Sequence, residues 1–77
     1  MIDSVEIGKT YLVRSGWGYW DTTHYPIGGC FCRADRSGLP AVYITVRRKF
    51  PSCHGATLDG VTQDGRIVAC GIDALCG

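Results

Sequence analysis

The chain has 77 residues, five cysteines and a formal net charge of +1. This length supports a single domain (residues 1–77) with a thin core, and the near-neutral charge excludes a global electrostatic drive toward nucleic acid or membranes. Because the chain opens on MIDSVEI, without a leader pattern, and has no apolar stretch near the roughly 20 residues that cross a bilayer, we expect a cytoplasmic protein with reduced thiols.

Strand-forming residues first occur at 10–14, where Tyr11-Leu12-Val13 is aromatic and β-branched. A second strand, Cys30–Ala34, is expected after a glycine pair and before the turn Asp35-Arg36-Ser37-Gly38. The strongest strand pattern is Ala41–Phe50, in which apolar and polar residues alternate. This alternation predicts that one face of the strand points into the core, through Val42, Ile44 and Val46.

The second half of the chain predicts a loop followed by a hairpin. Pro51 is expected to end the preceding strand, and residues 52–60 are small and turn-prone. Strands 61–63 and 66–70 then flank Asp64-Gly65, where glycine tolerates the positive φ of a tight turn.

The tail, residues 72–76, can form one short helical turn. No apolar pattern of helical period lasts ten residues, so we expect an all-β domain of five short strands closed into a small barrel. The order of elements, with a long loop after a first strand ending in YLVR, resembles the SH3-like small barrels (SH3, Tudor and KOW domains) between Glu6 and Cys76. That resemblance implies a fold with a long first loop, and no particular function.

Aromatic residues are concentrated in the segment 15–26, SGWGYWDTTHYP. Its glycines at 16 and 18 argue against a regular strand and predict a loop that displays the rings. Such rings form binding surfaces for peptides, cations or bases. The alternative is that Trp17 and Trp20 plug an open barrel end. The candidate partner-binding residues are Trp17, Tyr19, Trp20, His24 and Tyr25, with Tyr43 on the neighbouring strand.

The basic run Arg47-Arg48-Lys49 suggests a second kind of partner. Strand alternation places Arg47 and Lys49 on the solvent face beside Tyr43, with Arg48 pointing the other way. Joined by Arg33 on the predicted paired strand, these residues resemble a footprint for RNA or DNA. The alternative is a solvated strand end that guards against edge-to-edge pairing.

The cysteines and histidines offer weak metal and catalytic patterns. A zinc site would have to combine Cys30 and Cys32 with the adjacent Cys53 and His54, a spacing that structural zinc sites rarely use. The simpler expectation is that Cys30, Cys32 and Cys70 are small core residues, with no metal and no cofactor. A thiol–imidazole dyad would require Cys53 to meet the distant His24, and no other catalytic constellation is visible, so we expect no enzyme.

The sequence therefore predicts a non-enzymatic binding module that contacts a protein or peptide through segment 15–26 and strand 41–50, as a small inhibitor or adaptor. Nucleic-acid binding through the basic run is the alternative, and a zinc-stabilised domain is the third hypothesis. Self-association through exposed rings or an open β-edge is a further expectation.

Overall fold

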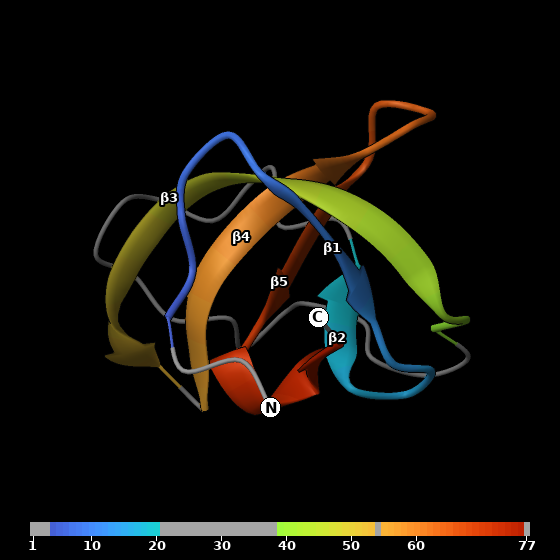
Figure 1. The fold of residues 1–77 in the computed structure, drawn as a ribbon. Helices are drawn as coiled ribbons and strands as arrows, with labels where there is room; N and C mark the ends of the chain where they lie inside the picture. Colours follow the sequence, from blue (N-terminus) through green and yellow to red (C-terminus); the bar gives the residue numbers. More distant parts are fainter. Residues whose placement is uncertain (1–3, 21–38, 54, 77) are drawn as a thin grey trace.

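The computed structural model describes residues 4–20, 39–53 and 55–76, and they form one antiparallel sheet that curls into a half-barrel (Figure 1). The strand order across the sheet is β2-β5-β4-β3-β1-β6. Its elements are β1 (Thr10–Val13), β2 (Gly18–Trp20), β3 (Val42–Cys53), β4 (Ala56–Thr62), β5 (Ile67–Cys70), a one-turn 3₁₀ helix (Ile72–Ala74) and β6 (Leu75–Cys76).

The all-β prediction is confirmed, and the curled sheet is consistent with a small barrel. The strand count differs, because the described part of the chain already contains six strands where five were expected. The predicted strand Cys30–Ala34 lies outside the described residues, so it adds nothing to either count.

The core fills the concave side of the sheet. Side chains that alternate along β3 point into it as predicted: Ile44 and Val46 are buried, and the half-buried Val42 packs against them. Cys70 is fully buried, which confirms its expected role as a small core residue. The other buried members of this cluster are Val5, Val13, Leu39, Leu58, Val68, Ala74 and Leu75.

The predicted loop 15–26 was wrong in part, because Gly18–Trp20 forms strand β2 and pairs with β5. The glycine at position 18 serves close packing rather than a turn. A Cβ atom built there would lie 2.5 Å from Leu39 Cδ2 and 3.0 Å from Val68 Cγ1. Glycine in a strand interior marks such a close approach, which the sequence pattern alone does not distinguish from a loop.

The predicted end of a strand at Pro51 and the predicted loop 52–60 were also wrong, because β3 continues to Cys53 and β4 begins at Ala56. The β3–β4 register shifts between Lys49 and Cys53, and such irregular pairing accommodates a proline that lacks an N–H donor. Gly60 pairs with Val46 and Val68 as part of β4, and glycine is required there because a Cβ atom would lie 2.6 Å from the Thr45 carbonyl oxygen.

The predicted hairpin around Asp64-Gly65 is confirmed, and Gly65 has a φ of +88°. The helical turn expected in the tail is present as a 3₁₀ helix at Ile72–Ala74. The last part of that tail is instead strand β6, which pairs with β1 through Leu75 and Cys76.

Candidate functional site

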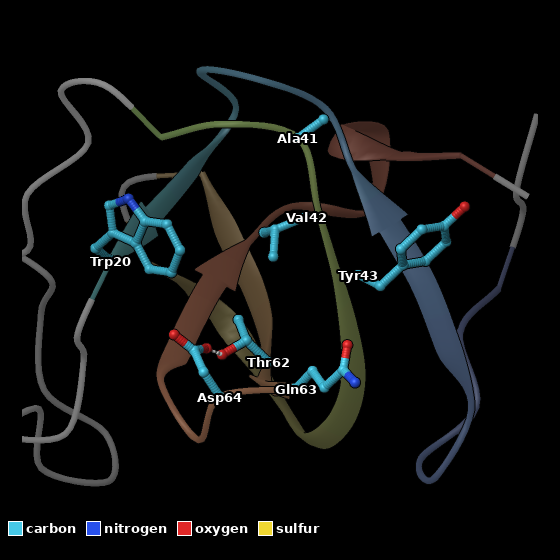
Figure 2. Close-up of a pocket in the computed structure, with 7 residues that line it drawn as sticks. All are labelled: Trp20, Ala41, Val42, Tyr43, Thr62, Gln63 and Asp64. Carbon is cyan, nitrogen blue, oxygen red and sulfur yellow. Dashed lines mark hydrogen bonds between the residues drawn. The ribbon is translucent and has the colours of Figure 1, made fainter.

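A groove of about 470 Å³ opens at one end of the half-barrel, between β2, the start of β3 and the β4–β5 turn. Its floor is apolar, and its rim at the hairpin is polar (Figure 2). The groove is lined by Trp20, Ala41, Val42, Tyr43, Thr62, Gln63 and Asp64.

Trp20 forms one wall of the groove. It ends β2 opposite Val68, and its half-buried indole packs against the core. The Arg66 guanidinium carbon lies 3.8 Å from the centroid of this ring, within cation–π distance. Arg66 itself is not among the residues that line the groove.

The polar rim is organised by the β4–β5 hairpin. The Thr62 hydroxyl hydrogen-bonds the Asp64 carboxylate and accepts from the Arg66 backbone N–H at 3.0 Å. The Thr62 hydroxyl, as the main cause, lowers the pKa of Asp64 below its ordinary value, helped by hydrogen bonding to the backbone and by the charge of Arg66. The exposed Asp64 side chain is therefore a carboxylate at neutral pH.

Tyr43 contributes to the rim, but its ring points to the side of β3 opposite Val42 and Trp20 (Figure 2). It is 64% exposed, the largest exposed fraction among the described large hydrophobic residues. On the convex face it stands beside Leu12, its partner across the β1–β3 pair. Tyr43 is thus displayed to solvent, as strand alternation predicted.

The remaining predicted aromatic residues do not gather at the groove. Trp17 is 43% exposed, and the Arg14 guanidinium lies 5.7 Å from its ring centroid. Tyr19 is half-buried against a second small cluster that contains Ala69. The structure therefore distributes the three described rings of segment 15–26 over separate surroundings, whereas His24 and Tyr25 lie outside the described residues.

The two tryptophans differ in which hypothesis for the aromatic segment they fit, the plug at the barrel end or the binding surface. Trp20 packs against the core in the way that a plug would, yet it also lines the groove. Trp17 is 43% exposed, as a contact residue would be, although it lines no part of this groove.

The basic run lies at a bulge in the sheet. The β3–β4 register shifts between Val46 and Arg48, so that Arg47 and Arg48 together face Asp59. The predicted opposite orientation of Arg48 was wrong for this reason, since the extra residue interrupts strand alternation.

Both arginines donate to the Asp59 carboxylate, which is fully buried. Arg47 does so through Nε and Nη2, each at 3.0 Å, and Arg48 does so through Nε at 2.7 Å. These hydrogen bonds, the main cause, raise the pKa of Arg47 above its ordinary value. Lys49 Nζ donates to the Val5 carbonyl at 2.9 Å. The whole run therefore has partners within the chain, and Arg33 lies outside the described residues.

The metal hypothesis falls largely outside the described part of the chain. Cys30, Cys32 and His54 are not among the described residues, and Cys53 is described only as the last residue of β3. Within residues 4–20, 39–53 and 55–76, no group of three or more metal-ligating side chains comes together.

Sequence reasoning missed the polar half of the groove and the carboxylate beneath the basic run. The sequence pattern predicts only strand and turn positions for Thr62 and Asp64, and a loop position for Asp59. The short Thr-x-Asp spacing before a glycine indicates a hydrogen-bonded turn. No sequence pattern indicates that this turn and Trp20 line the same groove.

Comparison of the chain with protein-family models, with curated proteins and with solved structures gave no match. Among the residues that the structure describes, no helix has the length and apolar character needed to span a membrane.

Proposed function

We propose that this chain is a non-enzymatic binding module, built on a small SH3-like barrel, that contacts a protein or peptide partner. The contact surface comprises the groove between Trp20 and Val42, its rim at Thr62–Asp64, and the exposed ring of Tyr43. It draws on both regions expected from the sequence, the aromatic segment 15–26 and strand 41–50.

The groove itself carries the proposal. An apolar floor with a few polar groups at one edge is the usual composition of a ligand site, because the floor supplies affinity and the edge fixes orientation. Tryptophan and tyrosine are also enriched among the residues that dominate binding energy at protein interfaces. A peptide side chain fits a groove of about 470 Å³ at the open end of the half-barrel.

The internal partners of the basic run favour a protein over a nucleic acid as the occupant. A phosphate-binding footprint needs cationic groups that can reach the phosphates. Arg47 is held by the buried Asp59, and Lys49 donates to the Val5 carbonyl. Part of the hydrogen-bonding capacity of these two groups is therefore already used within the chain, and the Asp59 carboxylate offsets one of the run's positive charges.

Selection of a random-peptide library on the immobilised protein, followed by calorimetry with the enriched peptides, tests this function. The informative variant is Ala41→Trp, which adds a large ring at an exposed residue that lines the groove and removes no core side chain. The matched control is Ile7→Trp, which adds the same ring at a 60% exposed position that does not line the groove.

We expect enriched peptides to bind the wild type and Ile7→Trp equally and to lose most of their affinity for Ala41→Trp. In NMR titrations the amides of residues 41–43 and 62–64 should shift first. Enriched peptides that bind Ala41→Trp as well as they bind the wild type, or a selection that enriches no peptide, would contradict the proposed function.

A further inference from the structure

One wall of the groove is charged. Among the described residues that line the groove, Asp64 alone carries a charge, and its carboxylate stands at the hairpin end of the apolar floor. The Thr62 hydroxyl orients this carboxylate and favours its ionised form. Any occupant of the groove therefore meets a negative charge beside an indole.

The opposite wall is a ring that already accommodates a cation. The Arg66 guanidinium lies 3.8 Å from the Trp20 centroid, although Arg66 is outside the groove lining. An aromatic face attracts cations through its quadrupole, and tryptophan does so best. The indole wall and the Asp64 wall both favour a cation, and the chain's own Arg66 already acts on both: its guanidinium lies over the Trp20 ring, and its charge helps to lower the pKa of Asp64.

The charge of the occupant follows from these two walls. An acidic side chain entering the groove would face the Asp64 carboxylate and be repelled by it. An uncharged apolar side chain would remove water from that carboxylate without replacing the lost interactions. A lysine or arginine side chain can lay its aliphatic stem along Val42 and place its charged end between the indole and the carboxylate.

We propose that the partner is a peptide segment that inserts a basic side chain into this groove, with its cationic end between Trp20 and Asp64. This inference rests on the proposed binding function and adds the chemistry of the partner. Arg66 limits the arrangement, because its guanidinium already covers part of the same indole.

A pair of small probes tests the inference separately from the binding function. N-acetyl-arginine methylamide and its citrulline counterpart have nearly the same shape, but only the first carries a charge. Titrated into isotope-labelled protein, the arginine probe should shift the Trp20 indole N–H and the Asp64 amide in a saturable manner. The citrulline probe should bind at least about tenfold more weakly, since it lacks the charge that Asp64 and the indole recognise.

Variants and selected peptides complete the test. Asp64→Asn keeps the shape of the rim and should weaken binding of the arginine probe about three- to tenfold at low ionic strength. Asp73→Asn, an exposed aspartate on the 3₁₀ helix outside the groove lining, should leave binding unchanged.

Equal affinity for the two probes, or no shift with the arginine probe, would overturn the cationic occupant. Library peptides that fill the groove without any basic residue would also overturn it, while leaving the proposed function intact. If peptides bound equally well to Ala41→Trp and the wild type, the proposed function itself would fall, and this inference with it.

Discussion

Replacing Asp59 with alanine should be among the most damaging single substitutions in this chain. Its side chain is fully buried and accepts three hydrogen bonds, two from Arg47 at 3.0 Å and one from Arg48 at 2.7 Å. Removing one partner of a buried ion pair typically costs about 3–5 kcal/mol, because the remaining charge is left uncompensated.

The expected loss of stability for Asp59→Ala is somewhat smaller, because the two arginines left without their carboxylate partner are partly exposed to solvent. The side chains of Arg47 and Arg48 are 42% and 22% exposed, respectively, so both guanidiniums recover part of their hydration. We therefore expect Asp59→Ala to lower the free energy of unfolding by about 2–4 kcal/mol. A domain of this length has a total stability of only about 4–12 kcal/mol, so the variant should be near its folding limit.

Urea unfolding followed by tryptophan fluorescence measures this loss, and a double variant tests its cause. In the Asp59→Ala background, Arg48→Met should restore stability, because it removes a partly buried charge that no longer has its partner. The exposed Glu6–Lys9 pair provides the control, and Glu6→Ala should leave the unfolding midpoint nearly unchanged. A loss below about 1 kcal/mol for Asp59→Ala, or an Arg48→Met effect that is the same in both backgrounds, would refute the reasoning.

Three further predictions concern two glycines, the buried Cys70 thiol and the Arg66–Trp20 contact. Gly60→Ala should cost about 1–3 kcal/mol, since its Cβ would lie 2.6 Å from a strand carbonyl, whereas Gly65→Ala should cost about 1 kcal/mol through its positive φ alone; urea titration that reverses this order would contradict the packing argument. Burial raises the pKa of Cys70 to about 12, so its thiol should resist iodoacetamide in the folded protein and react once urea unfolds the chain. Because the folded pKa exceeds the ordinary value of 9.0, the contribution of Cys70 to the free energy of unfolding is complete below pH 9 and is lost as pH rises toward about 12. The Cys70→Val variant should therefore lose less stability than the wild type over this pH range. An unchanged dependence of stability on pH would contradict this prediction. Arg66→Gln should lower stability by about 0.5–1 kcal/mol and alter Trp20 fluorescence, with Arg14→Gln, whose partner ring is 5.7 Å away, having the smaller effect; equal losses would argue against a cation–π contribution.

The parts of the fold that follow from local pattern could be predicted from the sequence. Alternation of apolar and polar residues identified the start of β3 and the side chains that face the core. The Asp64-Gly65 pair identified the β4–β5 turn, because a positive φ is a local requirement of the backbone. These features depend on residues that are neighbours in the chain.

The features that were missed depend on contacts between distant segments. Gly18 and Gly60 suggest flexible backbone in the sequence, yet both lie in strands where another element approaches too closely for a side chain. The bulge at Arg47 depends on how β4 pairs with β3, and it alone brings two arginines to Asp59. A local pattern contains no information about such approaches.

The same limit applies to the candidate site. The close spacing of rings in the aromatic segment predicts one surface, but β-strand alternation within Gly18–Trp20 sends Tyr19 and Trp20 to opposite faces of the sheet. Trp20 becomes part of a groove only because β2 pairs with β5, whose hairpin carries Thr62 and Asp64 to the same end of the half-barrel. Ring density in the sequence therefore indicated one wall of the groove, Trp20, whereas the charged group of the described lining, Asp64, comes from a turn that sheet pairing brings there.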